Sequence, residues 1–181
     1  MERIAFLWAV AAGALVLGGC STTSEARHAA GSSDDYFMVR ASQMNLSEIA
    51  TGKMASDRAM NEDVRAYGQE MVDAHQQANR ELQQLAEQRG VSLADRPDEA
   101  HVELSQHLAR LDGEAFDREY IGSMVANHAK ALSMFQDRAQ NASDPELRAW
   151  AQQMVPVLES HLEQARSIQR DLERMAPAST H

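Results

Sequence analysis

Four side chains that can bind a metal ion or a proton interrupt helical patterns that are otherwise apolar. Reading the chain at alternating steps of three and four residues gives four buried seams, and each seam contains one such side chain. These residues are Glu48, His75, His128 and His161. Imidazole nitrogens and carboxylate oxygens are common transition-metal ligands, so the convergence of these four groups would form a metal site.

All four residues lie near the middle of their predicted helices. Half of such a helix spans about 20 Å, so antiparallel packing brings the midpoints to within about one turn of a common level. A buried polar group without a partner costs about 1–3 kcal/mol, so three buried imidazoles need partners. Three arrangements stay open: a bound metal ion, a metal-free polar network that includes Glu48 and water, and a different register in which the histidines face solvent.

The elements that must position these residues are four long segments with helical periodicity and one short segment. Ser33, Asn61 and Ser143 precede long segments as candidate N-caps, and Gly90 follows the second one as a stop signal. The predicted helices are 34–56, 62–89, 98–111, 114–140 and 143–175.

The two halves of the chain resemble each other. Sliding the sequence by 83 positions (147 − 64) lays VRAYGQEMV at 64–72 on LRAWAQQMV at 147–155, with five of nine residues identical. Self-similarity at a fixed period indicates repeated structural units. The predicted fold is therefore all-α, an up-down four-helix bundle built from two repeated helix hairpins, with a short extra helix in a connection that crosses along the bundle.

The N-terminal sequence predicts a targeting signal. An apolar run at 4–17 is about 14 residues long, whereas a membrane span takes roughly 20. It ends in Leu-Gly-Gly-Cys at 17–20, which resembles a bacterial lipobox, whose cysteine is lipidated and becomes the first mature residue. The resemblance implies a signal peptide at 1–19 and a lipid on Cys20. It further implies, from Ser21, anchoring at the periplasmic face of the outer membrane.

The remaining composition narrows the possible roles. The net charge of −10 argues against nucleic acid as a partner, and with a single cysteine no internal disulfide can form. The small polar stretch 20–33 is predicted to be a lipidated flexible tether, 34–176 the helical domain, and 177–181 a tail. No nucleophile elbow, phosphate loop or paired-carboxylate arrangement is present, so nothing in the sequence demands catalysis.

Several blocks resemble a ferritin-like family of bacterial exported and outer-membrane proteins, a domain of unknown function. They are FDREY at 116–120, MVxxH at 71–75, His128, and VPVLESH at 155–161. The resemblance implies an up-down ferritin-like bundle in which Glu48, His75, His128 and His161 occupy the characteristic polar positions, and it implies no established activity. The Glu-x-x-His pairs of di-iron ferritin-like enzymes are absent from the predicted helices, which argues against a di-iron site.

Together these features predict an envelope lipoprotein that binds one transition-metal ion through the mid-bundle cluster. Zinc, copper, nickel and iron all suit three imidazoles and one carboxylate. The membrane is the one predicted partner, reached through the N-terminal lipid. The alternative is a non-catalytic structural or interaction module of the envelope whose buried polar layer holds no metal, and a redox enzyme ranks last because carboxylates are scarce.

Overall fold

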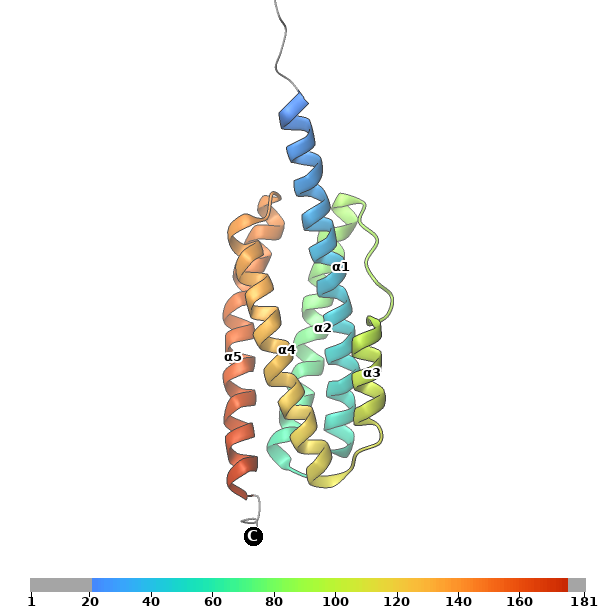
Figure 1. The fold of residues 1–181 in the computed structure, drawn as a ribbon, viewed down its shortest axis with the longest axis vertical. Coiled ribbons are helices and arrows are strands. Elements are labelled where there is room, and N and C mark those ends of the chain that lie inside the picture. The colour runs from blue at the N-terminus through green and yellow to red at the C-terminus, as the bar shows by residue number, and fades with distance from the viewer. Residues whose placement is uncertain (1–20, 176–181) are drawn as a thin grey trace, which may run out of the picture.

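The fold is all-helical. The computed structural model describes residues 21–175, with side chains from residue 33 onward, and every element in that range is an α-helix. The helices are α1 (Ser21–Arg58), α2 (Glu62–Arg89), α3 (Glu99–Leu108), α4 (Gly113–Asn141) and α5 (Pro145–Met175). α1 pairs with α2 and α4 pairs with α5 as two hairpins, and the connection that contains α3 runs along the bundle from one end to the other (Figure 1). The prediction of an all-α bundle is confirmed.

The ends of the helices follow the capping signals closely. The Asn61 side chain accepts hydrogen bonds from the backbone N–H groups of residues 63 and 64, and Gly90 ends α2 in the left-handed conformation with φ 67°. At the start of α5, the cap is Asp144 instead of the predicted Ser143, because its carboxylate accepts the N–H of Leu147 at 2.8 Å. Pro145 then occupies the first helical position, where its missing N–H is not needed.

The largest difference from the predicted boundaries is at the start of α1. This helix begins at Ser21, so its backbone is helical across residues 21–33 and Ser33 is not its N-cap. No proline interrupts the segment, and Ala, Glu and Arg favour helix, so the helix can extend upstream. The role of 20–33 as a tether stays a prediction. The predicted signal peptide at 1–19, Cys20 and the tail at 177–181 lie outside the described residues.

None of the helices between residues 21 and 175 combines the length and the apolar character that a membrane-spanning segment requires.

The core consists of two apolar clusters. One is built around the aromatic group of Phe37, Phe135 and Trp150, whose ring centroids are 5.0–6.3 Å apart. The other contains Tyr67 and Tyr120 with centroids at 6.3 Å. The buried histidines belong to neither cluster, so the bundle carries a polar layer inside an otherwise apolar interior.

Two glycines allow α1 and α2 to approach closely. A Cβ atom built on Gly68 would lie 2.8 Å from the carbonyl oxygen of Gly52 and 2.8 Å from the Cβ atom of Ala55. Both clashing partners belong to α1 and cannot swing away like the end of a long side chain. The close contact of the first hairpin therefore requires glycine at position 68.

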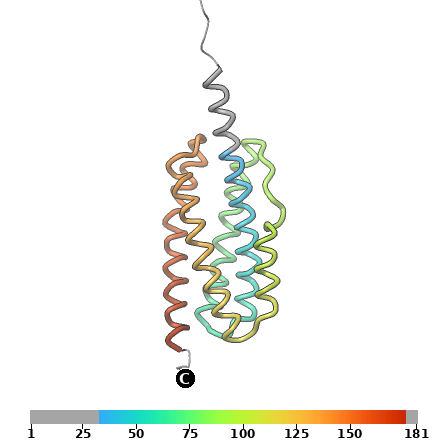
Figure 2. Tube along the Cα trace, in the orientation of Figure 1, coloured from blue at the N-terminus to red at the C-terminus, as the bar shows by residue number. Residues whose placement is uncertain are grey.

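Two buried aspartates hold the hairpins together at opposite ends. Asp117 on α4 accepts the N–H groups of Met60 and Asn61 in the α1–α2 turn at 3.1 and 2.7 Å. Asp34 on α1 accepts the N–H groups of Ser143 and Asp144 in the α4–α5 turn at 2.9 and 3.0 Å. Figure 2 shows these two turns at opposite ends of the bundle.

These contacts carry the same spacing as the sequence repeat. Asp117 and Asp34 are 83 positions apart (117 − 34), and so are the turn residues that they bind. The structure thus places equivalent residues of the two halves in equivalent contacts. Each hairpin therefore hydrogen-bonds to the turn of the other through one buried aspartate.

Candidate metal centre

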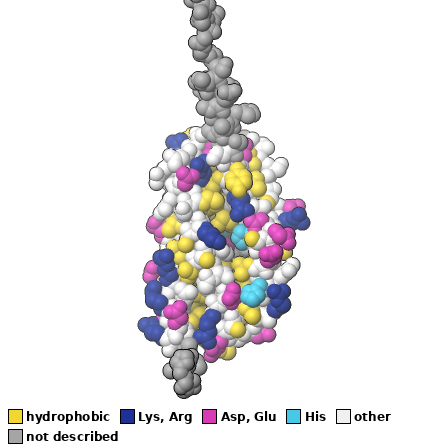
Figure 3. All heavy atoms as spheres, in the orientation of Figure 1, with side chains coloured by type: hydrophobic (Ala, Val, Ile, Leu, Met, Phe, Trp, Pro, Cys, Tyr) yellow, Lys and Arg dark blue, Asp and Glu magenta, His cyan; other side chains and the backbone are white. Residues whose placement is uncertain are grey.

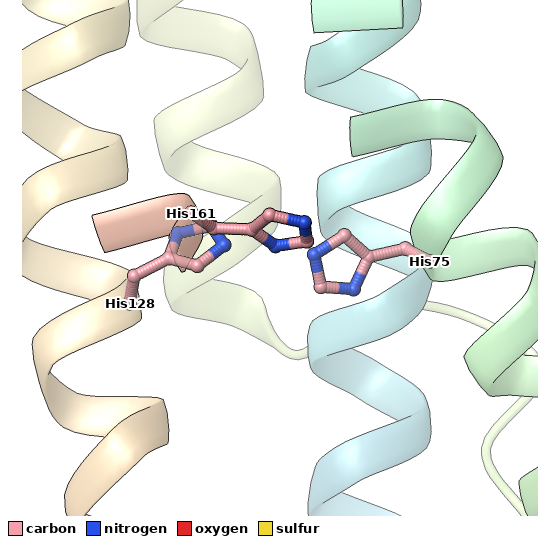
Figure 4. Close-up of side chains that lie close together, drawn as sticks. All are labelled: His75, His128 and His161. Atoms are coloured by element: carbon pink, nitrogen blue, oxygen red, sulfur yellow. The ribbon is translucent and has the colours of Figure 1, made fainter. Parts of the chain in front are cut away.

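Three histidines from three helices meet in the middle of the bundle. His75 lies on α2, His128 on α4 and His161 on α5, with exposures of 7%, 2% and 4%. One ligand nitrogen from each ring lies within 4.8 Å of the other two, and the ring centroids are 5.4–5.9 Å apart. Figure 4 shows the three rings pointing toward one another. The predicted convergence of the three imidazoles is therefore present in the fold.

Hydrogen bonds on the far side of two rings set their orientation. His75 Nδ1 lies 2.9 Å from Asn45 Oδ1, and His128 Nδ1 lies 3.0 Å from the backbone oxygen of Met124. Both partners are acceptors, so each Nδ1 carries the hydrogen and donates it. The Nε2 atom of each ring is then left with a lone pair, as in histidines that bind metals.

His161 is oriented in the opposite sense. Its Nε2 atom lies 3.8 Å from Glu70 Oε1, which favours a proton on that nitrogen. The free lone pair is then on Nδ1. The buried ring nitrogens without a hydrogen-bond partner in the described structure are Nε2 of His75, Nε2 of His128 and Nδ1 of His161.

The environment keeps all three rings neutral. Burial lowers the pKa of His75 well below 6.5, and the neighbouring rings of His128 and His161 lower it further. Burial also lowers the pKa of His128 to about 4 and depresses the pKa of His161, against an opposing effect of Glu70. Neutral imidazole is the form that donates electrons to a metal.

The three residues fit a transition-metal ion. Three lone pairs that face one another cannot hydrogen-bond among themselves, and each unpartnered acceptor costs about 1–3 kcal/mol. A metal with nitrogen ligands at 2.0–2.1 Å in tetrahedral geometry places those nitrogens about 3.4 Å apart. The present separations, at most 4.8 Å, need only a small inward movement of the rings to reach that geometry.

Glu48 lies beside the histidine triad. It is 3% exposed, Asn127 Nδ2 donates to its Oε1 atom at 3.3 Å, and its Oε2 atom has no partner among the described residues. Burial raises the pKa of Glu48 to about 7. Its carboxylate is not in the group of ligand atoms within 4.8 Å, so the structure brings together three of the four predicted ligands and leaves Glu48 next to them.

A small cavity connects Glu48 with the triad. It has a volume of about 20 Å³, and Glu48, His75 and His128 all line it. One water molecule fits such a volume when polar groups surround it. Glu48 would therefore reach a bound ion only across this cavity, either directly or through a water molecule.

Three polar residues of this layer are not predicted by the sequence pattern. Asn45 sets the His75 ring, and its position is equivalent to that of His128 in the 83-residue repeat (128 − 45). The Tyr67 hydroxyl donates to the backbone oxygen of His161 at 3.3 Å, while the buried Tyr120 hydroxyl has no hydrogen-bond partner within residues 33–175. Burial and then the charge of Glu48 raise the pKa of both tyrosines. Tyr120 belongs to the FDREY block, and this was the available signal.

The histidines of α3 do not join the cluster. His107 is on the surface, with Nε2 3.7 Å from Glu119 Oε1, and His101 Nδ1 lies 2.6 Å from Asp98 Oδ1. His107 thus offers a matched surface histidine for comparison with the triad.

The fold and the buried triad define a class of all-helical bundle domains with a histidine cluster in the core. The chain belongs to the family described as "Domain of unknown function (DUF4142)", whose model matches residues 20–168. The predicted membership of a family of unknown function is thereby confirmed. No curated protein matches the sequence.

Solved structures share the fold. A DUF305 protein from Streptomyces coelicolor, named as a candidate secreted protein, is 17% identical, covers 84% of this chain and 98% of its own, and has a TM-score of 0.69. A DUF305 fragment from Deinococcus radiodurans is 16% identical, covers 79% of this chain and 97% of its own, and has a TM-score of 0.67. At these identities the similarity concerns the helical fold alone.

Proposed function

We propose that this protein is an envelope lipoprotein that binds one transition-metal ion through His75, His128 and His161. In this proposal the bundle has the ferritin-like arrangement, and Glu48 lies at the edge of the site as a further oxygen ligand or as a partner of a bound water. Binding or buffering of the ion is the role, and no catalytic step is assigned.

One observation carries the proposal: three buried ring nitrogens converge and none has a hydrogen-bond donor among the described residues. Two of the rings are held on their far sides by Asn45 and by the backbone of Met124, which fixes the tautomer that a metal requires. A cation satisfies all three lone pairs at once.

The donor set determines the class of ion. Neutral imidazoles suit zinc, copper, nickel and iron, whereas calcium and magnesium prefer oxygen ligands. A bound ion would supply Lewis acidity and a fixed positive charge in the polar layer. The residues of the chain orient the rings and exclude bulk water.

The test is the metal content of protein purified without an affinity tag and without a chelator, then reloaded and dialysed. We expect about one equivalent of ion per chain, and a rise in unfolding free energy of about 2.7 kcal/mol at a free metal concentration of one hundred Kd. His128→Gln removes one ligand and should abolish retention, while the surface variant His107→Gln should retain the ion as the wild type does. Less than about a tenth of an equivalent in the wild type after reloading refutes the proposal.

A metal-free polar layer is the alternative outcome. The cavity beside Glu48 has room for a single water, which could bridge His75 and His128. In that case no ion is retained, and His128→Gln changes the melting temperature alone. The protein would then be a structural or interaction module of the envelope.

Anchoring through Cys20 is the second part of the proposal. It is supported by the Leu-Gly-Gly-Cys string and by a similar fold in a protein named as a candidate secreted protein. Radiolabelled palmitate should be incorporated into the wild type and not into Cys20→Ser, and the wild type should fractionate with outer membranes. Equal labelling of both chains would contradict lipidation at this residue.

A further inference from the structure

An open groove lies on the face formed by α1, α3 and α4. Its volume is about 400 Å³, and its walls come from all three helices. Figure 3 shows this face, where basic and histidine side chains stand among acidic and apolar ones. It is the face along which the connection containing α3 packs (Figure 1).

The groove and the cavity at the metal centre share two wall residues. Met44 on α1 and Asn127 on α4 line both spaces. They are equivalent positions in the 83-residue repeat (127 − 44), one in each hairpin. On the inner side of this wall, the Asn127 amide donates to Glu48.

The charges of the groove favour anions. Arg40 is paired with Asp98, and Asp98 also accepts from His101, so these charges are largely satisfied. Lys130 forms no ion pair with another described residue and leaves the groove with one net positive charge, in a chain whose net charge is −10. The one unpaired charge among the residues that line this path is therefore positive, which favours a small anion over a free divalent cation.

We propose that this groove is the route by which a small anionic ligand reaches the ion at the triad, passing between Met44 and Asn127. The inference rests on the proposed metal site and adds to it a ligand that does not come from the protein. Three protein ligands leave a coordination position open. The cavity of about 20 Å³ behind the wall holds one water-sized group, so only a slender anion can pass its ligating end to the site.

A competing path would enter beside Glu70 on α2, whose side chain is 44% exposed and lies 3.8 Å from His161 on α5. Its carboxylate repels anions, so this path should contribute little to anion entry. Obstructing each path separately distinguishes the two.

The first experiment follows azide binding to the full chain loaded with one equivalent of Co²⁺, using the visible absorption of the metal in stopped flow. Ala126→Trp places a bulky ring in the groove, while Ala129→Trp places the same ring on the exposed surface of α4 outside it. We expect Ala126→Trp to slow azide association at least about tenfold and Lys130→Glu to slow it about tenfold, with Co²⁺ affinity unchanged. Ala129→Trp should behave as the wild type.

Equal rates in Ala126→Trp and Ala129→Trp overturn the proposal. A larger slowing by Glu70→Trp than by Ala126→Trp also overturns it, because entry then occurs beside Glu70. Loss of Co²⁺ from the wild type refutes the proposed function itself, which is a separate result.

A second measurement needs no metal. Deuterium exchange at the C2 carbon of a histidine ring needs only water, and peptide mass spectrometry gives the exchange rate at His75 and His128 individually. In the apoprotein, Ala126→Trp should slow the exchange at these two residues relative to Ala129→Trp, while His107 exchanges equally in both. Equal rates at His75 and His128 show that the groove is not the route.

Discussion

Acid should affect the stability of the apoprotein in opposite ways when either His128 or Glu48 is replaced. The folded pKa of His128 is about 4, below its ordinary 6.5, so on acidification the unfolded chain takes up a proton that the folded chain refuses. Stability that is present above pH 6.5 is therefore lost as the pH falls toward 4. Glu48 behaves in reverse: its folded pKa is about 7, above its ordinary 4.5, so its contribution is largest below pH 4.5 and is lost as the pH rises through 7.

The magnitudes follow from linkage. Between pH 6.5 and pH 4.5, proton uptake by the unfolded chain at His128 costs about 2 kcal/mol of stability. Over the same interval, the folded chain binds a proton at Glu48 more strongly than the unfolded chain does, and this raises the stability by about 2 kcal/mol. His128→Gln should therefore lose about 2 kcal/mol less than the wild type on acidification, and Glu48→Gln should lose about 2 kcal/mol more.

The assay is urea unfolding of chelator-treated protein at the two pH values, followed by far-ultraviolet circular dichroism and by the fluorescence of Trp150. His107→Gln, which removes a histidine ring from the surface, is the matched control variant. If His128→Gln and Glu48→Gln both keep the wild-type pH dependence, then these groups are not held in the protonation states that the structure implies, and the argument for a neutral triad fails.

Three further predictions concern packing and the orientation of the triad. Gly68→Ala should lower the unfolding free energy by about 1–3 kcal/mol, because the new Cβ would meet the α1 backbone. Gly122→Ala, in open space on α4, should raise the unfolding free energy by about 0.5–1 kcal/mol, and denaturant titration compares the two variants. Asp117→Ala should lower the unfolding free energy by about 3 kcal/mol in the same assay, because two backbone N–H groups of the α1–α2 turn lose their acceptor. A loss no larger than that caused by replacing an exposed aspartate with alanine would contradict this role of Asp117. Asn45→Ala should weaken metal binding about 10- to 100-fold by releasing the His75 ring, and an unchanged Kd in a competition titration would show that this hydrogen bond does not matter.

The sequence predicts most of the helical fold because local signals determine it. Asn61 and Gly90 delimit α2 at the residues expected, since capping chemistry depends on only a few neighbours. The start of α1 was placed too late because composition alone does not separate a helix from a polar tether when no breaker is present. The buried Asp117 was also missed, since its partners in the α1–α2 turn are distant in sequence, although the repeat aligns it with Asp34.

The sequence predicted at which height along the bundle the candidate site lies, but not the directions and hydrogen-bond partners of its side chains. Seam periodicity brought His75, His128 and His161 to one layer, because helical rise and turn lengths fix where midpoints meet. Periodicity cannot show which direction a side chain takes within that layer. In the structure Glu48 faces Asn127 and the small cavity, and Asn45 holds the His75 ring, which no sequence pattern predicted.

The division of the triad between the hairpins makes its geometry depend on the docking of the two halves. His75 belongs to the α1–α2 unit, while His128 and His161 belong to the α4–α5 unit. The three nitrogens face one another only while the two units are docked, so mechanical strain or detergent that separates them disperses the donor set. A bound ion would then be retained while the two hairpins are docked. Its release would mark the first separation of the two hairpins.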